Sequence, residues 1–153
     1  MIVELDIMEV ALCEWIGTKR YEMNRASNIP ISLMGKHNPI KGDIQGFKAE
    51  YAFAKRYNLF PDFGLFPRNG SADGITRNGK RYDIKSTHHK KGNLLATTKV
   101  NTDIDIYILA VVNDNIVEFV GWAEKAELIK ESNLKDLGYG KGYFLSREKL
   151  NKF

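Results

Sequence analysis

The sequence has little cysteine, little histidine and no long apolar run. Its single cysteine, Cys13, excludes an internal disulfide and a cysteine-rich zinc site, and its place in an apolar helical pattern predicts a small buried side chain. No apolar run has the length of a membrane span, and the N-terminus lacks the basic and then apolar layout of a signal peptide. We therefore expect a protein without a membrane partner in the reducing cytoplasm.

The length of 153 residues supports one sizeable core but not two full domains. No internal repeat, low-complexity tract or linker interrupts the chain, so we expect a single domain over residues 1–153. Within it we assign 1–42 to an N-terminal helical extension and loop, 43–122 to a core, and 123–153 to C-terminal helical and loop elements.

Hydrophobic spacing predicts an α/β chain. It indicates helices over residues 3–18, continuing to 26, over 43–57 with Asp43 as N-cap, and over 123–131, with a last helical turn from Ser146. The β-prone runs predict strands at 63–67, 94–100, 104–112 and 116–122. The third of these is nearly all apolar, which indicates burial on both faces, and the fourth is its expected antiparallel partner. Residues 28–42 predict a surface connection, and residues 138–142 predict a mobile loop.

Residues 73–85 predict a tight β-hairpin that carries two carboxylates and a lysine. Asn78-Gly79 favours a two-residue type I′ turn, which would place Thr76 opposite Arg81 and Gly74 opposite Asp83. Asp83 and Lys85 then share one face, whereas Asp73 falls on the other. A ladder irregularity at 72–74, permitted by Gly74, is needed to unite the carboxylates. A fully regular hairpin with the carboxylates on opposite faces would exclude a shared metal site.

These residue types suit metal-dependent phosphodiester cleavage. A divalent metal lowers the pKa of water and neutralises developing charge, and Mg²⁺ usually takes one or two carboxylates together with other hard oxygen ligands. Asp73 and Asp83 supply such a pair, and the carbonyl of Ile84 is a further hard ligand. Lys85 would position the attacking water or stabilise charge on phosphorus. Glu50 borders the apolar stripe of its helix, from where its carboxylate would reach toward the sheet.

In this order, Glu50 on a helix followed by Asp73 and Asp83-x-Lys85 resembles the PD-(D/E)xK nuclease superfamily. The resemblance runs from Gly46 to Trp122, but Ala72 replaces the proline that often precedes the first acid. It implies a restriction-endonuclease-like fold, with a central mixed β-sheet flanked by helices and an additional N-terminal helix. It also implies Asp73, Asp83 and Glu50 as metal ligands, Lys85 as the catalytic lysine, and Mg²⁺ as cofactor, with Mn²⁺ as a substitute.

The net charge of +4 is concentrated around the hairpin, since the segment from Arg77 to Lys91 carries +5. Such a segment suits a polyanion, although a solvated hairpin tip is an equal explanation on charge alone. The expected nucleic-acid contacts are Arg77, Lys80, Arg81, Thr87, His88, Lys90, Lys91 and Lys99.

The sequence therefore predicts a metal-dependent nuclease, and the resemblance favours a DNA endonuclease. The small size leads us to expect a homodimer on duplex or branched DNA. Two alternatives stay open. One is a non-catalytic nucleic-acid-binding module on the same fold, and the other is an RNA-processing nuclease or an assembly factor of a larger nucleic-acid complex.

Overall fold

A computed structural model describes residues 1–29, 38–66, 71–99 and 103–153. In chain order, its elements are β1 Ile2–Glu4, α1 Ile7–Ala26, α2 Pro39–Tyr57, β2 Gly74–Ile75, β3 Arg81–Thr87, β4 Leu94–Thr97, β5 Ile106–Asn113, β6 Ile116–Glu124, α3 Lys125–Leu128, a 3₁₀ turn Glu131–Asn133, β7 Leu134–Asp136, β8 Lys141–Leu145 and a 3₁₀ turn Arg147–Lys149.

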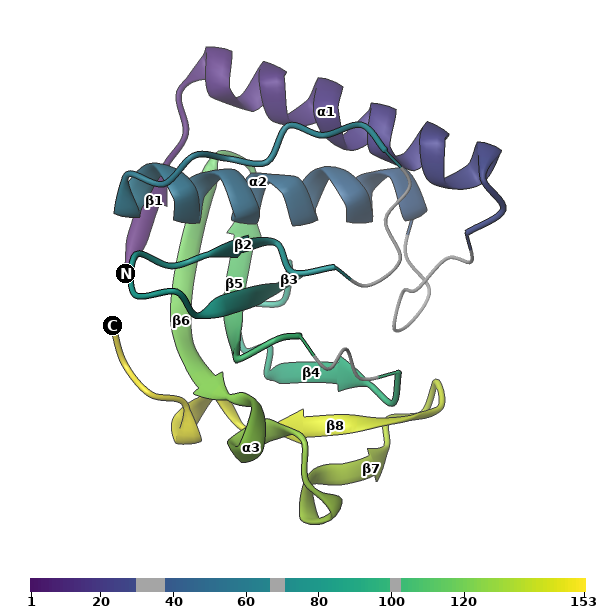
Figure 1. The fold of residues 1–153 in the computed structure, drawn as a ribbon, viewed down its shortest axis with the longest axis vertical. Helices are drawn as coiled ribbons and strands as arrows, with labels where there is room; N and C mark the ends of the chain where they lie inside the picture. The colour runs from purple at the N-terminus through teal and green to yellow at the C-terminus, as the bar shows by residue number, and fades with distance from the viewer. Residues whose placement is uncertain (30–37, 67–70, 100–102) are drawn as a thin grey trace.

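The described residues form two sheets. The larger sheet has the strand order β1-β6-β5-β3-β2, in which only β3 and β5 are parallel, and the smaller sheet is antiparallel with the order β4-β8-β7. Helices α1 and α2 lie together on one side of the larger sheet, and the smaller sheet lies at the other end of the molecule (Figure 1). The protein is therefore mixed α/β, with a curled mixed sheet flanked by helices, as the sequence predicts.

The two long helices begin where polar side chains can cap them. Asp6 accepts from the amides of Met8 and Glu9 in a capping box, so α1 starts at Ile7 and the preceding residues form β1. The expected helical start near Val3 is therefore wrong, but the end at Ala26 agrees. Asn38 caps α2, with Pro39 in the first turn where its missing N–H costs nothing. Helix α2 therefore starts at Pro39, and the expected N-cap at Asp43 is wrong because Asn38 and Pro39 together form a stronger start signal.

Two apolar cores share β5. One core lies between the helices and the larger sheet and includes Cys13, Phe53 and Ile108, while the other lies between the two sheets and includes Leu109. Because alternate side chains of a strand point to opposite faces, β5 is buried on both, as its apolar run predicts. Burial raises the pKa of the Cys13 thiol to about 12, which fits the expected structural role.

Several expected elements differ from the structure. Residues 63–66 form no strand, and Pro67 lies outside the described residues. The expected helix over 123–131 shrinks to α3, and the expected loop over 138–142 runs into β8, which pairs with β4 and β7. Strand β4 ends at Thr97, and Val100 lies outside the described residues. The sequence predicts strand β4 of the smaller sheet but not β7 and β8, because these short strands depend on pairing within the sheet rather than on local propensity.

Within the residues described, no helix is both long and apolar enough to cross a membrane.

Candidate functional site at the β2–β3 hairpin

The turn of the hairpin differs from the expected two-residue type. The Thr76 amide donates to the Lys80 carbonyl at 2.8 Å, which leaves the three residues Arg77–Gly79 in the loop. Gly79 has a φ of 83°, the left-handed conformation that a three-residue hairpin loop requires at its last position. The expected pairs Thr76–Arg81 and Gly74–Asp83 are therefore wrong, because the longer loop shifts the pairing by one residue.

This shift changes the pairing beside the two aspartates. Gly74 pairs with Tyr82 instead of the expected Asp83, and the paired residues of β2 end at Gly74. The ladder also departs from regular pairing here, since the Asp73 amide donates to the Tyr82 carbonyl at 2.9 Å although Gly74 is the partner of Tyr82. An irregularity thus occurs where the sequence predicts one, but the turn contributes most of the change.

The Asp73 carboxylate lies at the edge of β3. Its Oδ2 accepts a hydrogen bond from the Ile84 amide at 2.6 Å. Strand β2 spans only Gly74–Ile75, so no residue of β2 lies beside Ile84. The N–H and C=O of one strand residue point to the same side, so the Ile84 carbonyl is directed toward Asp73 as well. Two hard oxygen donors of the expected metal site therefore face the same edge.

Gly74 makes room for the Tyr82 side chain. A Cβ atom at residue 74 would lie 2.3 Å from the Tyr82 hydroxyl oxygen, too close for a real contact. We expect Gly74→Ala to lower the free energy of unfolding by about 1–3 kcal/mol, as overpacking usually does, in urea denaturation. Gly46→Ala is the matched control, since nothing lies within 4 Å of a Cβ there. Equal stability of the two variants would contradict the close approach.

Asp83 and Lys85 are neighbours on one face of β3. The Lys85 Nζ lies 2.7 Å from Asp83 Oδ2, and the Asp83 side chain is only 18% exposed. Asp83 pairs with Tyr107 of β5, whose pKa is raised to about 12 by burial and by the Asp83 charge. The pair therefore sits at the border of the core between the two sheets.

Glu50 projects from α2 and is held by Arg20 of α1. The Arg20 guanidinium donates to Glu50 Oε2 at 2.7 Å and to the carbonyl oxygens of Asp62 and Gly64. It also lies over the Phe47 ring, 4.4 Å from its centroid. Arg20 is 7% exposed, so this buried charge depends on these partners.

Arg20 is not among the site residues that the sequence predicts, although its position on the helix gives a signal. Cys13, Ile16 and Gly17 form the buried face of α1, and Arg20 continues their spacing. A charged residue on a buried helical face needs a partner, and here the partner is the candidate ligand Glu50.

The expected site residues influence one another electrostatically. Burial raises the pKa of Asp73 well above its usual value, and the charges of Glu50 and Asp83 raise it further, while the Ile84 amide and Lys85 oppose them. Burial, followed by Asp73 and Glu50, raises the pKa of Tyr82 to about 12. The charges of Glu50, Asp83 and Lys85 thus all act on Asp73, and Lys85 and Asp83 are also in direct contact.

The arrangement leaves each carboxylate with a different partner. Glu50 contacts Arg20, Asp83 contacts Lys85, and Asp73 accepts from the Ile84 amide. Accordingly, no three or more His, Cys, Asp or Glu side chains among the described residues are grouped so that they would hold a metal as they stand. Mg²⁺ needs only one or two carboxylates, and a cation beside Asp73 would offset the repulsion that raises its pKa. The donor set around Asp73 and Asp83 therefore fits a hard divalent cation.

We expect Asp73→Asn to stabilise the metal-free protein increasingly as pH rises. Because the pKa of Asp73 is higher in the folded state, wild type loses stability as pH increases from its ordinary value of 3.8 through the raised pKa. Asparagine is uncharged and still accepts from Ile84. Denaturation in chelator at pH 4 and pH 8 checks this expectation, and a pH-independent difference between variant and wild type would contradict it.

The same variant also tests the cation. Mg²⁺ or Mn²⁺ at 100 times its Kd should stabilise wild type by about 2.7 kcal/mol and leave Asp73→Asn almost unchanged. An equal shift in both proteins would place the cation elsewhere.

The expected nucleic-acid contacts fall into two groups. Arg77, Lys80 and Arg81 lie at the hairpin turn, where Lys80 pairs with Glu124 at 2.9 Å and Arg81 with Asp103 at 3.5 Å. The other group follows the far end of β3, roughly 20 Å away along a seven-residue strand, and consists of Thr87, His88, Lys90 and Lys91, with Lys99 beyond β4. The single positive segment of the sequence is thus two positive regions in space, with Asp83 and Lys85 between them.

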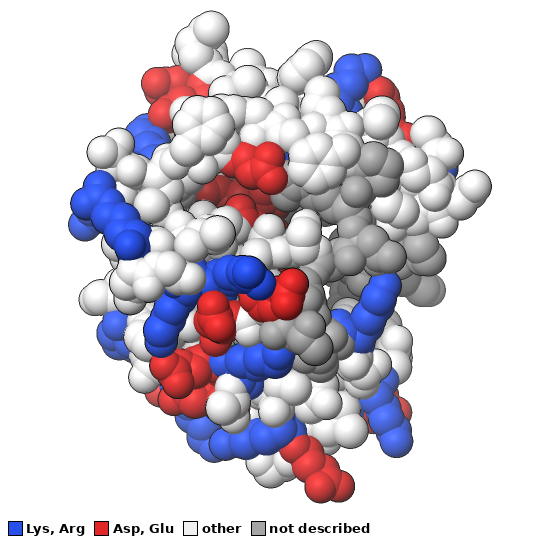
Figure 2. Space-filling view, in the orientation of Figure 1, with Lys and Arg blue, Asp and Glu red and all other residues white. Residues whose placement is uncertain are grey.

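Figure 2 shows acidic atoms recessed in a hollow of the surface at the height of α2 and β2, with basic and acidic side chains intermixed on the surface below. A negative hollow is suited to a cation inside it.

Comparison of the chain with protein-family models, with curated proteins and with solved structures finds no significant match.

Proposed function

We propose that the protein is a metal-dependent nuclease that hydrolyses phosphodiester bonds, a DNA endonuclease of the PD-(D/E)xK superfamily with a restriction-endonuclease-like fold, acting in the cytoplasm. The observation that carries the proposal is the convergence of Asp73 with Glu50, Asp83 and Lys85, whose charges all act on its pKa. These residues come from helix α2, strand β3 and the residue that precedes β2, so simple alternation along a solvated strand does not account for their mutual influence.

Each residue has a separate task in this reaction. Asp73 and Asp83, with the Ile84 carbonyl, would hold Mg²⁺ or Mn²⁺, which supplies Lewis acidity for the attack of water on phosphorus. Lys85 sits beside Asp83, where its ammonium would orient the attacking water or stabilise charge on the phosphoryl oxygens. Glu50, held by Arg20, would complete the site as a ligand through a water or as an acceptor that orients one.

Cleavage of supercoiled plasmid, single-stranded DNA, four-way-junction DNA and structured RNA, with Mg²⁺ and with chelator, tests the proposal. We expect Mg²⁺-dependent cleavage of at least one DNA substrate. Cleavage of RNA alone would favour the RNA-processing alternative, and cleavage in chelator would contradict the metal role.

A binding module without turnover is the second candidate. The ion pairs Lys85–Asp83 and Arg20–Glu50 favour this candidate, because both neutralise the charge of a site carboxylate without a metal ion. Tight DNA binding without cleavage under any metal would support this candidate.

Binding to DNA should weaken strongly with salt if the two positive regions contact phosphates. Each neutralised phosphate releases counterions, so we expect a several-fold or greater loss of affinity between roughly 50 and 200 mM salt. Fluorescence anisotropy with labelled DNA measures this slope, and the paired variant Lys90→Ala/Lys91→Ala should make it shallower. A salt-independent affinity would argue against phosphate contacts.

The expected homodimer is also a proposal. Helix α1 exposes Met8, Leu12 and Trp15, which share one side of the helix and would suit a second copy. Sedimentation of wild type and Trp15→Lys tests whether this face associates.

A further inference from the structure

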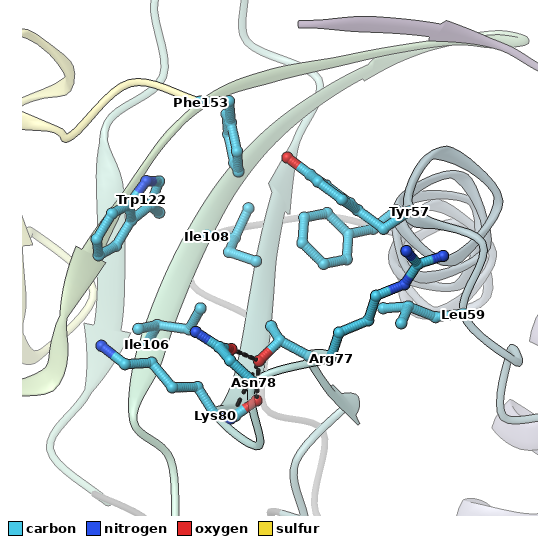
Figure 3. Close-up of a pocket in the computed structure, with 11 residues that line it drawn as sticks. Tyr57, Leu59, Arg77, Asn78, Lys80, Ile106, Ile108, Trp122 and Phe153 are labelled. Carbon is cyan, nitrogen blue, oxygen red and sulfur yellow. Dashed lines mark hydrogen bonds between the residues drawn. The ribbon is translucent and has the colours of Figure 1, made fainter.

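We infer that the apolar cavity beside the hairpin tip binds one nucleotide of the DNA substrate, with its base against aromatic side chains and its phosphate at the hairpin cations. The inference rests on the proposed function. The cavity has a volume of about 340 Å³ and is formed by the end of α2, strands β5 and β6, the hairpin turn and the final residue Phe153 (Figure 3). Among the described residues, its lining includes no Asp or Glu side chain and none of the candidate metal ligands, so it is separate from the candidate metal centre.

The walls of the cavity suit a flat aromatic ligand. Figure 3 shows Tyr57, Trp122 and Phe153 arranged around Ile108. The Trp122 indole is fixed by its Nε1, which donates to the Lys152 carbonyl at 3.4 Å, and the Tyr57 and Phe153 ring centroids are 6.4 Å apart. Base–aromatic stacking contributes about 1–3 kcal/mol per base and tolerates any base, as expected of a wall with few polar groups.

The charge at the rim selects a phosphate-bearing ligand. Arg77 and Lys80 line the cavity from the hairpin turn, and Figure 3 shows the Arg77 guanidinium beside Leu59. The volume is within the range of small-ligand sites, which is roughly 300–1,000 Å³. Aromatic walls with cations at one side match a base joined to a phosphate better than they match a purely apolar ligand.

The position of the cavity links it to the metal centre. Lys80 lines the cavity, and Asp83 is three residues further along the chain, roughly 10 Å in extended conformation. The Asp83 side chain lies level with Tyr107, on the other face of the larger sheet from the cavity residues Ile106 and Ile108. A DNA strand with its scissile phosphate near Asp83 would therefore pass over the hairpin tip to place a neighbouring nucleotide in the cavity. Placing a base there requires it to leave the stack, which costs a few kcal/mol for a paired base and least for an unpaired one. The expected substrate class is therefore DNA with unpaired nucleotides near the cleavage point.

Tryptophan fluorescence tests the cavity without any cleavage. The chain has two tryptophans, so Trp15→Phe leaves Trp122 as the only reporter. In chelator, dAMP should quench this signal saturably, deoxyadenosine should bind at least about 5-fold more weakly because it lacks the charge-assisted phosphate contact, and inorganic phosphate should leave the signal unchanged. Arg77→Ala should reduce dAMP affinity to that of deoxyadenosine, whereas the exposed Lys130→Ala serves as the matched control and should bind as wild type.

Two results would overturn the inference. One is quenching that is unsaturable or equal for Arg77→Ala and Lys130→Ala, and the other is binding of an apolar dye in the cavity with no competition by dAMP. Calorimetry of Tyr57→Leu, which removes an aromatic wall but stays apolar, should show at least about a 5-fold weaker dAMP affinity, in line with the loss of one stacking contact.

The experiments distinguish a failure of the proposed nuclease function from a failure of the cavity assignment. If Asp83-dependent cleavage persists but dAMP does not bind, only the cavity assignment is wrong. If dAMP binds but cleavage is absent or independent of Asp83, the nuclease proposal is wrong and the cavity remains a nucleotide site.

Discussion

Replacing Asp83 with asparagine is expected to reduce Mg²⁺-dependent DNA cleavage by at least about 100-fold, the scale on which loss of one preorganised charge acts in an active site. The carboxylate is one of the two that converge at the hairpin, and the amide cannot balance a divalent charge. Cleavage rates at saturating Mg²⁺ measure the effect, and titration with Mg²⁺ should show weaker metal binding. The exposed Glu131→Gln is the matched control and should cleave as wild type.

Lys85→Met should produce a similar loss of cleavage through a different cause. The lysine is not a metal ligand, and its ammonium donates a hydrogen bond to Asp83 Oδ2 at 2.7 Å. Its removal frees that oxygen, so metal affinity should stay equal or rise while the cleavage rate falls. This split between binding and rate separates a catalytic lysine from a structural one. Normal cleavage in both Asp83→Asn and Lys85→Met, with intact folding by circular dichroism, would refute the site.

Replacing Arg20 with methionine is expected to lower the free energy of unfolding by about 3 kcal/mol, because removal of one partner leaves the Glu50 charge uncompensated in a largely buried position. The guanidinium also supplies the hydrogen bonds to the Asp62 and Gly64 carbonyl oxygens, which hold the segment after α2. Urea denaturation measures the loss. Lys19→Met is the matched control on the same helix, since its ion pair with Glu22 is exposed and should contribute less than about 1 kcal/mol.

A double-mutant cycle identifies the partner. Arg20→Met combined with Glu50→Gln should be more stable than the sum of the single effects implies, because the unpaired charge is then gone. Strict additivity, or equal losses in Arg20→Met and Lys19→Met, would show that Arg20 acts through packing alone. Should Glu50 serve the metal centre, Arg20→Met is also expected to lower cleavage, and Arg20→Lys should restore part of it.

The elements that the sequence predicts well are those with a strong local pattern. The buried run of β5 and the end of α1 follow from hydrophobic periodicity, which needs no knowledge of distant segments. The expected start of α1 is wrong because Val3 and Leu5 are apolar in either a helix or a strand, and the partner of Val3 in β6 lies more than 100 residues away in the chain. Strands β7 and β8 are not predicted because they too depend on pairing within a sheet rather than on local propensity.

The sequence by itself determined which residues carry the candidate chemistry: two aspartates and a lysine in a hairpin, and a glutamate on the preceding helix. It could not determine their geometry. One extra residue in the turn moves every side chain of β2 to the other face relative to β3, because the side-chain period of a strand is two. Only the tertiary structure decided that the Asp73 carboxylate accepts from the Ile84 amide, and only helix packing brought Arg20 to Glu50. Both depend on contacts that local sequence patterns do not specify.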